Sequence, residues 1–595
     1  MSAQSDVPRA EYPRPQFQRE DWRNLNGLWT FTFDFGKTGH DRKLYERNGF
    51  DSKILVPFCP ESRLSGVEHT DHISAMWYHR SISVPSEWAG RKILLHFGAV
   101  DYFSAIYVDG KLVDQHWGGT SSFETDITSC VKPGATHNLV VYVEDNLRQG
   151  LQAGGKQSYN YYSEGCSYTR TTGIWQTVWM EAVHPAGLKR ASIVPELDQS
   201  RFVVYPEFYG LQRGEKLKVD VRDGSRTVAS VTVPAASPTV AILPVKQVKT
   251  WSPESPFLYN ISLEVLDEQG KTIDRVASYA GMRKVHVEGN RLYLNNQPYY
   301  LRLVLDQGFY PTGVWTAPTD GDLKRDIELS MQAGFNGARL HQKVFEERFH
   351  YWADQLGYLT WGESSSWGLD IEKPEAARNF ISEWESIVLR DRNHPSIIAW
   401  TPFNETDRRH VHYQHTRQHD RFLRDLYEIC HALDYRPVND ASGYFHVRTD
   451  LWTVHNYEQN PDKLKDVLSL KEGKVWQNFP DREATYSGQP YFVDEYGGIK
   501  WIAGNKFAEN SWGYGEGPRS IDEFIARLEG LTNAILNHEH IAGYCYTQLT
   551  DVEQEQNGIY NYDRSPKFDM SKIKAILGKN PASDIYKNAE TGKKK

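Results

Sequence analysis

Several sequence features are scarce or missing in this chain, and each absence excludes a class of protein. Only five of the 595 residues are cysteine and no CxxC pair occurs, so neither a structural zinc site nor a dense disulfide framework is predicted, although one bridge is compatible with the count. No run approaches the roughly twenty apolar residues that span a bilayer, so no membrane association is predicted. The net charge of -9, with no Lys/Arg stripe outside the C-terminal tail, argues against a nucleic-acid binder.

The motifs of several enzyme classes are also absent. Without a GxSxG elbow or a Gly-rich phosphate loop, neither a serine hydrolase nor a nucleotide-binding site is indicated. No HExxH pattern accompanies the histidines, so no metal and no cofactor is predicted, and five histidines are interpreted as structural: His341, His394, His410, His412 and His415. The N-terminus has no apolar signal-peptide core, which leaves the compartment open between cytoplasmic and, if a leader preceded this sequence, periplasmic or secreted. A homo-oligomer is compatible with the sequence.

Aromatic residues, by contrast, are abundant. They make up 13% of the chain, with 18 Trp and 34 Tyr. Sugar rings present apolar C–H faces that stack on aromatic side chains, so this composition is compatible with carbohydrate binding. Many β-sandwiches also use aromatics in their strands, and core packing is the expected role of those in the first part of the chain.

The first part of the chain reads as short strands separated by turn residues. Strand-length apolar or alternating runs recur at residues 28–33, 92–97, 105–108 and 139–143. Asp109-Gly110 is typical of a tight hairpin turn between two such runs. The pattern predicts an all-β sandwich over residues 1–183.

A second β segment follows, with strand-like runs at residues 201–205, 217–221 and 259–265. Its length, near one hundred residues, predicts an immunoglobulin-like sandwich over residues 184–283. After Arg283 the pattern changes to amphipathic helices that alternate with short apolar strands, at residues 320–333, 346–355 and 376–391 for the helices and 334–340, 358–363 and 397–402 for the turns and strands. Alternation over nearly 300 residues predicts a closed eight-stranded (β/α)8 TIM barrel over residues 284–595.

In such barrels the loops after the strands build the active site, so carboxylates at strand ends are the first candidates for catalysis. Four carboxylates occupy such positions: Glu363, Glu405, Asp494 and Glu495. Retaining glycoside hydrolysis needs two carboxyl groups about 5–5.5 Å apart, one to protonate the leaving oxygen and one to attack the anomeric carbon. Since two groups suffice, Glu363 is expected in the pocket wall, and Asp494 is expected to orient the strand end or to form an outward salt link.

A set of ordered motifs resembles glycoside hydrolase family 2. Asn393-His394-Pro395-Ser396-Ile397-Ile398-Ala399-Trp400 followed by Asn404-Glu405 is similar to its signature, and Val493-Asp494-Glu495-Tyr496-Gly497 to its nucleophile strand. The motifs Leu25-Asn26-Gly27-Leu28-Trp29 and Thr172-Gly173-Ile174-Trp175-Gln176-Thr177 resemble its sugar-binding-type jelly roll, and Trp251-Ser252-Pro253-Glu254-Ser255-Pro256 its immunoglobulin-like domain. The resemblance covers nearly the whole chain. It implies a jelly-roll β-sandwich, an immunoglobulin-like sandwich and a catalytic TIM barrel.

The resemblance also implies roles for individual residues. It makes Glu405 the general acid/base and Glu495 the nucleophile. It implies that Arg339 keeps the nucleophile ionised and that Asn404 binds the sugar 2-hydroxyl, while His455 and Tyr457 match a position where a Tyr hydroxyl can bond the nucleophile. Further residues are expected around the sugar: Glu363, Trp367, Trp501, Trp512 and Tyr546, the last in place of an aromatic that the family usually has as Trp.

Departures from the family pattern bear on the substrate. Glucuronidases of the family hold the sugar carboxylate with an Asn-x-Lys element, and the comparable stretch here, Glu555-Gln556-Asn557-Gly558-Ile559-Tyr560, lacks the cation. A neutral terminal sugar is therefore expected, a β-galactoside first. The segment at residues 303–308 lacks the Asn-x-His pattern of many galactosidases, which keeps an α-L-arabinofuranosidase or β-galactofuranosidase as an alternative. The prediction is thus a retaining exo-glycosidase acting on a glycoside or oligosaccharide, and the competing class is a carbohydrate-binding protein that has lost catalysis.

Overall fold

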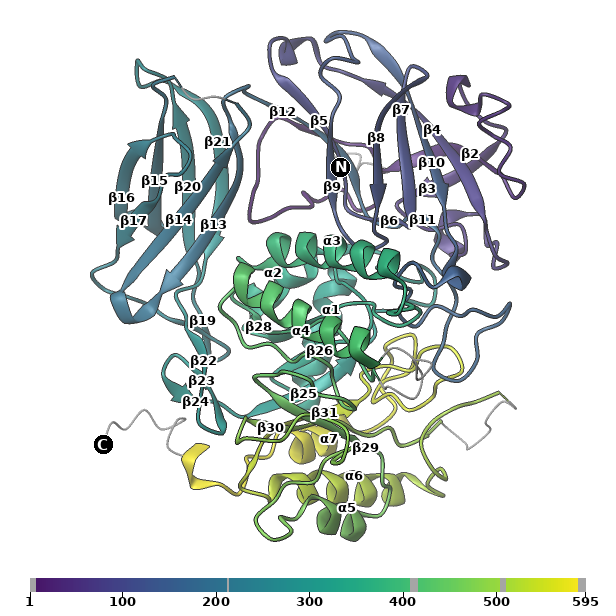
Figure 1. Ribbon diagram of the computed structural model, residues 1–595, viewed down its shortest axis with the longest axis vertical. Coiled ribbons are helices and arrows are strands. Elements are labelled where there is room, and N and C mark those ends of the chain that lie inside the picture. Colours follow the sequence, from purple (N-terminus) through teal and green to yellow (C-terminus); the bar gives the residue numbers. More distant parts are fainter. Residues whose placement is uncertain (1–6, 211–212, 407–415, 503–509, 587–595) are drawn as a thin grey trace.

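The structure is a computed structural model that describes residues 7–210, 213–406, 416–502 and 510–586. Two β-sandwiches lie side by side along one side of an α/β barrel, next to its helices α2 (Glu347–Leu356) and α3 (Pro374–Asp391) (Figure 1). The N-terminal sandwich is drawn in purple and dark blue, the second in teal, and the barrel in green and yellow. Over the described residues, no helix has both the length and the apolar character needed to cross a membrane.

The N-terminal domain is an antiparallel sandwich of a six-stranded sheet, order β3-β2-β4-β10-β7-β8, and a four-stranded sheet, order β1-β12-β5-β9, with a short β11-β6 pair. Asp109 and Gly110 turn β7 into β8 with φ of 48° and 77°, as a tight hairpin of this type requires. The strands are β1 (Trp22–Asn24), β2 (Gly27–Phe33), β3 (Ser52–Val56), β4 (Ala75–Ser83), β5 (Lys92–Phe97), β6 (Val100–Asp101), β7 (Phe103–Val108), β8 (Lys111–Trp117), β9 (Phe123–Asp126), β10 (Thr136–Glu144), β11 (Gly173–Ile174) and β12 (Val178–Val183), with 3-10 turns η1 (Leu44–Glu46), η2 (Arg63–Ser65), η3 (Ser86–Trp88) and η4 (Leu147–Gln149).

The second domain packs two antiparallel sheets, of order β13-β14-β17 and β16-β15-β20-β21, around one apolar core. Each sheet buries alternate residues, as in β20, where the buried positions recur with period two. The elements are β13 (Leu188–Glu196), η5 (Leu197–Gln199), β14 (Arg201–Phe208), β15 (Lys216–Asp223), β16 (Arg226–Pro234), β17 (Ala241–Pro244), β18 (Trp251–Ser252), β19 (Ser255–Pro256), β20 (Tyr259–Leu266) and β21 (Thr272–Ala280), and a small sheet of β22 (Val285–Glu288), β23 (Arg291–Leu294) and β24 (Gln297–Pro298) leads into the barrel.

The barrel is a curled parallel sheet covered by helices on its outside (Figure 1). Seven strands hydrogen-bond in the order β28-β27-β26-β25-β31-β30-β29. They are β25 (Leu301–Asp306), β26 (Gly337–Leu340), β27 (Leu359–Glu363), β28 (Ile397–Thr401), β29 (Trp452–Asn456), β30 (Tyr491–Gly497) and β31 (Ile541–Thr547). The helices are α1 (Asp320–Ala333), α2 (Glu347–Leu356), α3 (Pro374–Asp391), α4 (Thr416–Leu433), α5 (Pro461–Leu468), α6 (Ile521–Leu536) and α7 (Met570–Leu577).

The place of an eighth strand, between β28 and β29, is taken by residues 437–442, which form only isolated bridges. The N–H of Trp400 donates to Pro437, and that of Asn439 donates back to Trp400, at 3.1 and 2.9 Å. On the other side the N–H of Gly443 donates to the Thr453 hydroxyl at 2.9 Å. The predicted (β/α)8 architecture is confirmed, with this one strand irregular.

Helix positions agree with the sequence pattern to within two residues. α1 occupies the predicted range and begins at a capping box, in which Thr319 and Asp322 each accept a hydrogen bond from the other's backbone N–H. α3 begins two residues earlier than predicted because Pro374 fits the first turn, where no backbone N–H donor is needed. The N-terminal domain docks on α3 through Glu383, whose carboxylate accepts hydrogen bonds from both the N–H and the hydroxyl of Thr120. All five cysteines are unpaired.

Candidate active site

One buried arginine organises the carboxyl end of the barrel. Arg339, from β26, is fully buried and forms ion pairs with three carboxylates: Glu363 at 2.9 Å, Asp494 at 3.2 Å, and Glu495. The Oδ1 atom of Asn404 accepts another hydrogen bond from this guanidinium at 3.0 Å. The planar fork of an arginine can serve several acceptors at once, so four side chains from the ends of three strands, β27, β28 and β30, converge on a single cation.

Glu495 is held in a strongly positive environment. Its second carboxylate oxygen accepts a hydrogen bond from the Tyr457 hydroxyl at 2.5 Å, and Tyr457 also contacts the Thr547 hydroxyl at 2.9 Å. Burial alone would raise the pKa of Glu495, but the charges of His455, Arg339 and Lys156 and the Tyr457 bond lower it to about 2. Glu495 is therefore ionised over the whole range in which proteins usually work, as a nucleophilic carboxylate must be.

His455 lies between the two carboxylates that the sequence singled out. Its Nδ1 atom is 2.6 Å from Glu405 Oε1 and 3.4 Å from Glu495 Oε2, and its Nε2 atom is 3.3 Å from Asp494 Oδ1. Burial opposes its charge, yet the carboxylates of Glu495, Asp494 and Glu405 raise the pKa of His455 to about 10. The ring is therefore a cation that can donate hydrogen bonds from both of its nitrogens.

Glu405 and Glu495 face one another at close range. A carboxylate oxygen of each and a ring nitrogen of His455 all lie within 4.8 Å of one another. This spacing suits a retaining glycosidase, because an inverting enzyme holds its carboxyl groups about 6.5–9.5 Å apart to admit a water molecule. Glu405 follows β28 with a left-handed backbone, φ 47°, a conformation that costs free energy and often marks functional sites.

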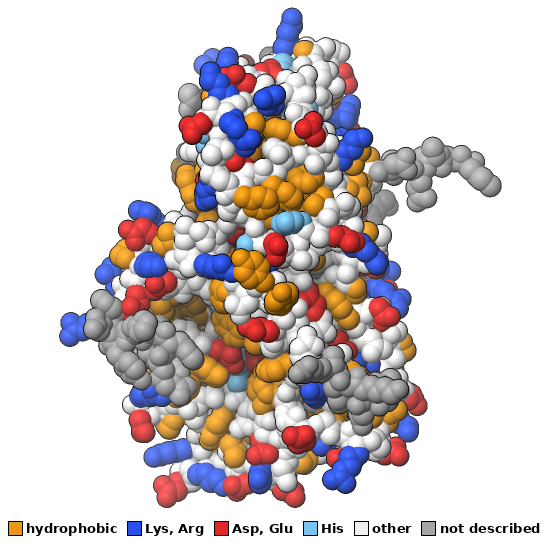
Figure 2. Space-filling model, turned by 90° about the vertical axis from the view of Figure 1, so that its right-hand side faces the viewer, with side chains coloured by type: hydrophobic (Ala, Val, Ile, Leu, Met, Phe, Trp, Pro, Cys, Tyr) orange, Lys and Arg blue, Asp and Glu red, His pale blue; other side chains and the backbone are white. Residues whose placement is uncertain are grey.

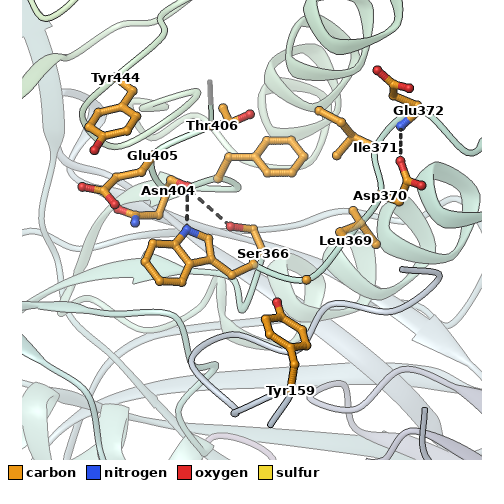
Figure 3. A pocket seen from close by; sticks show the side chains of 13 residues that line it. Tyr159, Ser366, Leu369, Asp370, Ile371, Glu372, Asn404, Glu405, Thr406 and Tyr444 are labelled. Atoms are coloured by element: carbon orange, nitrogen blue, oxygen red, sulfur yellow. Dashed lines mark hydrogen bonds between the residues drawn. The ribbon is translucent and has the colours of Figure 1, made fainter. Parts of the chain in front are cut away.

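A cavity of about 630 Å³ opens beside these groups. In Figure 3, Asn404, Glu405 and Tyr444 form one side, and Tyr159 of the N-terminal domain approaches from the other. The lining residues are Tyr159, Ser366, Trp367, Gly368, Leu369, Asp370, Ile371, Glu372, Phe403, Asn404, Glu405, Thr406 and Tyr444. The Glu405 side chain is 18% exposed and that of Glu495 6%, so Glu405 stands nearer the opening. Figure 2 shows a hollow on one side of the molecule in which acidic and His side chains lie among hydrophobic ones.

Other residues expected around the sugar lie beside this cluster. Trp367 lines the cavity, and its indole N–H donates to the Asn404 carbonyl at 3.1 Å. The Nδ2 atom of Asn404 is buried and has no hydrogen-bond partner among the described residues, so it is free to donate to a ligand. Glu363 accepts from the Gln342 N–H at 3.1 Å and lies 3.0 Å from His341, and burial raises its pKa to about 7 despite the Arg339 charge.

Of the two roles expected for Asp494, the outward salt link is wrong, and Tyr546 does not face the candidate site. Asp494 does not point outward: it is 1% exposed and accepts hydrogen bonds from Arg339 and, at 2.6 Å, from the Ser442 hydroxyl. A register shift between Val493 and Tyr496 breaks the strand alternation, so neighbouring residues of β30 both reach Arg339. Tyr546 lies in the barrel's outer core, packed against Tyr496, whereas the next residue, Thr547, contacts the Tyr457 hydroxyl.

The other aromatic and histidine residues singled out in the sequence differ in where they lie relative to the candidate site. Trp512 is half-buried beside Tyr514 at 4.9 Å, and Trp501 packs into the core against Phe524. His394 bonds Asp354 at 2.6 Å, as a structural histidine does, but His341 contacts Arg339 at 2.7 Å inside the candidate site. The remaining histidines of that prediction lie outside the described residues: His410, His412 and His415.

Four residues of the site escaped sequence reasoning: Lys156, Ser442, Tyr514 and Thr547. Ser442 links Arg339, Asp494 and His455 through its hydroxyl. The Tyr514 ring stacks on Tyr457 with centroids 3.4 Å apart. No local motif marks either residue, because each reaches the site from an irregular segment whose path depends on the whole fold.

Comparisons with known proteins agree with this architecture. Three family models match in order: "Glycosyl hydrolases family 2, sugar binding domain" at residues 64–178, "Glycosyl hydrolases family 2" at 195–283, and "Glycosyl hydrolases family 2, TIM barrel domain" at 285–579. A beta-glucuronidase of Paenibacillus borealis is 24% identical over 95% of this chain and 98% of its own length.

A beta-galactosidase of Thermoanaerobacter pseudethanolicus is 26% identical over 80% of this chain and 60% of its own length. Among solved structures, a β-glucuronidase from Ruminococcus gnavus in complex with D-glucuronic acid superposes with a TM-score of 0.78. That match covers 96% of this chain and all of the other at 22% identity, which supports the fold alone. The similar proteins thus carry two different sugar specificities.

Proposed function

Because the chain belongs to glycosyl hydrolase family 2, we propose that it is a retaining, exo-acting β-glycosidase in which Glu405 is the acid/base and Glu495 the nucleophile. Family membership makes it a glycoside hydrolase that acts on O-glycosyl bonds. The observation that carries the finer proposal is the approach of the two carboxylates within 4.8 Å, one of them held ionised by Arg339 and Tyr457.

The proposed reaction has two displacements. Glu405 gives its proton to the leaving glycosidic oxygen while a Glu495 oxygen attacks the anomeric carbon, which forms a glycosyl-enzyme and releases the alcohol. The ionised Glu405 then removes a proton from water, whose oxygen attacks the same carbon and frees Glu495. Two inversions keep the anomeric configuration. The free Nδ2 of Asn404 supports a role in binding the sugar 2-hydroxyl beside the nucleophile.

The relative depth of the carboxylates supports exo action. Glu495 is the more deeply buried of the two and is bonded by Tyr457, while Glu405 is more exposed and lines the cavity. A terminal sugar would therefore occupy the inner end, and the leaving group would lie among cavity residues such as Tyr159 and Tyr444 (Figure 3). Aromatic side chains of this kind suit stacking against the apolar face of a second sugar or an aryl group.

For the sugar itself we keep the expectation of a neutral glycoside, with a β-galactoside first and a furanoside as the alternative. In the segment comparable to the glucuronidase element, Asn557 donates to Glu555 at 3.0 Å and accepts from Gln548 at 2.7 Å. Glu555 and Asn557 are buried, and no residue of the segment 555–560 is cationic. A carboxylate at Glu555 would repel a uronate group placed beside it.

A panel of aryl glycosides, followed by NMR of the first-formed sugar, tests the proposal. Release of the same anomer as in the substrate supports it, and release of the opposite anomer contradicts it. Treatment with a 2-deoxy-2-fluoro glycoside and mass spectrometry of peptides should locate an adduct on Glu495. A carbohydrate-binding protein without catalysis would accumulate no such adduct.

A further inference from the structure

A loop of the N-terminal domain enters the catalytic barrel. The N–H of Gly154 donates to the Trp367 carbonyl at 2.8 Å, and that of Gly155 donates to the Ser365 carbonyl at 3.0 Å. Gly155 has φ 58°, and a Cβ there would lie 2.2 Å from the Gln342 carbonyl oxygen, so the close approach requires glycine. The residue that follows these two glycines is Lys156.

Lys156 is buried beside Trp367 and has no direct hydrogen-bond or ion-pair partner within the described part of the chain. Its residue is 7% exposed, and its ammonium lies 5.4 Å from the centroid of the Trp367 ring. Among the described residues, it donates no hydrogen bond and forms no ion pair through this group. By contrast, the equally buried Lys343 donates to the carbonyls of Gly308 and Trp315 at 2.5 and 2.7 Å.

The charge of Lys156 is nevertheless compensated at longer range. Burial lowers its pKa, but Cys166, Glu555, Glu495 and Glu405 outweigh burial and raise the pKa above the ordinary lysine value. The ammonium is therefore charged near neutral pH, beside the carboxyl groups of Glu555, Glu495 and Glu405. Among the described residues it has no hydrogen-bond acceptor in contact, so the three N–H donors of the ammonium are available to a ligand.

The surroundings decide which acceptor fits. Glu555, near Lys156, is 1% exposed and is bonded by the Tyr168 hydroxyl and by Asn557 at 3.0 Å. An anionic sugar substituent between Lys156 and this carboxylate would be repelled by Glu555 as well as by Glu405 and Glu495. Neutral hydroxyls can accept from the ammonium and donate to a carboxylate, so both groups gain a bond.

We propose that Lys156 is a substrate-binding residue, donating hydrogen bonds to hydroxyl groups of the neutral terminal sugar, so that the N-terminal domain completes the catalytic pocket. The inference deepens the proposed function and rests on it. No relative's name or family model assigns this lysine. In this proposal, the part of the N-terminal domain that contacts the sugar at the scissile bond is the docked loop that carries Lys156. A separate surface of the N-terminal sandwich is not involved.

The test compares Lys156→Met with Lys373→Met on the best neutral aryl glycoside. Lys373 lies at the same domain junction, where its ammonium donates to the Gln149 carbonyl at 2.9 Å, but it is far more exposed. We expect K156M to lower kcat/KM about 10- to 100-fold, the usual range for losing a charge-assisted hydrogen bond, with K373M close to wild type. Equal melting temperatures of the two variants would show that the loop still docks.

A monodeoxy series of the same glycoside separates binding from a structural role. If Lys156 binds a particular hydroxyl, removing that hydroxyl should reduce kcat/KM strongly in the wild type and hardly at all in K156M. Equal losses in both proteins, or a K156M variant within twofold of K373M, would overturn the inference. So would a K156M variant that loses only the cleavage of uronides, since Lys156 would then bind an anion.

Failure of the proposed function would look different. An active Glu495→Gln enzyme would contradict the proposed mechanism. Whether Lys156 binds the sugar would then be decided by binding measurements. Calorimetric titration of the free sugar into wild type and K156M reports on Lys156 without any turnover. Equal affinities would overturn the inference, and a loss of 10-fold or more in K156M would support it.

Discussion

The imidazole Nδ1 of His455 lies 2.6 Å from the carboxylate of Glu405, and the same nitrogen lies 3.4 Å from Glu495. One cation thus stands between the two carboxyl groups, which approach within 4.8 Å of one another. Arg339 pairs with Asp494 Oδ2 and Glu495 Oε1, and His455 lies near the other oxygen of each carboxylate. Removing either cation should therefore change the protonation of the carboxyl groups and the stability of the fold.

Glu495→Gln should lower kcat by at least about 10⁴-fold, because an amide cannot form the glycosyl-enzyme. Glu405→Ala should lower kcat less for aryl glycosides with good leaving groups, since these need little protonation, and added azide should restore turnover as a glycosyl azide of retained configuration. Steady-state rates and NMR of the azide product check both outcomes. A glycosyl azide of inverted configuration would contradict the assignment of the two roles.

His455→Gln should move the acid limb of the pH–kcat/KM profile upward by about one unit or more, because an opposite charge near a carboxyl commonly lowers its pKa by 1–3 units. His455 is the largest of the charges that lower the pKa of Glu495 to about 2, so its removal lets that carboxyl protonate at higher pH. Rates measured from pH 3 to 7 locate the limb. An unmoved limb would mean that Arg339, Lys156 and Tyr457 fix the ionisation of Glu495 without His455.

His455 should also make stability depend on alkaline pH. Its pKa is raised from 6.5 in the unfolded reference to about 10 in the fold, so its contribution is complete below pH 6.5 and is lost as pH rises toward 10. Between pH 6.5 and 9.5 the wild type should lose on the order of 2 kcal/mol more unfolding free energy than H455Q. Urea unfolding at both pH values measures the difference, with His137→Gln on the N-terminal sandwich as a control. Parallel losses in wild type and H455Q would show that His455 is not charged in the fold.

The sequence could predict Glu405 and Glu495 because each follows a regular parallel strand within a recognisable motif, and barrel geometry turns such strand ends toward one centre. It could not predict the direction of Asp494 or Tyr546, because strand alternation decides which neighbour faces inward and a register shift at Val493–Tyr496 breaks that alternation. The place of Lys156 in the site could not be predicted from the sequence for another reason. Its position depends on a docking contact between segments more than 200 residues apart, which no local pattern encodes.

Arg339→Met should destabilise the fold by about 3–5 kcal/mol, as expected when one partner of a buried ion pair is removed. Glu363, Asp494 and Glu495 would each lose the guanidinium that compensates their burial. Since protonation relieves buried carboxylates, the destabilisation should shrink below pH 5. Arg23→Met is a matched control, because that arginine is half-exposed and faces Glu87 at 3.6 Å. Equal effects of the two variants on urea unfolding would contradict the central role of Arg339.

Thr547→Val and Tyr546→Phe should differ although the two residues are adjacent. The Thr547 hydroxyl contacts the hydroxyl of Tyr457, which donates to Glu495, so its loss leaves Tyr457 less well oriented and should lower kcat/KM about 3- to 10-fold, the cost of one neutral hydrogen bond. The Tyr546 hydroxyl is buried in the outer core and interacts there with the Ile499 backbone, so Y546F should preserve activity and change stability by no more than about 1 kcal/mol. Kinetics and melting curves of both variants decide between the neighbours. If Y546F were the damaged enzyme and T547V the intact one, the side chain reaching the sugar would be the aromatic one, and the inward face of β31 would have to be reassigned.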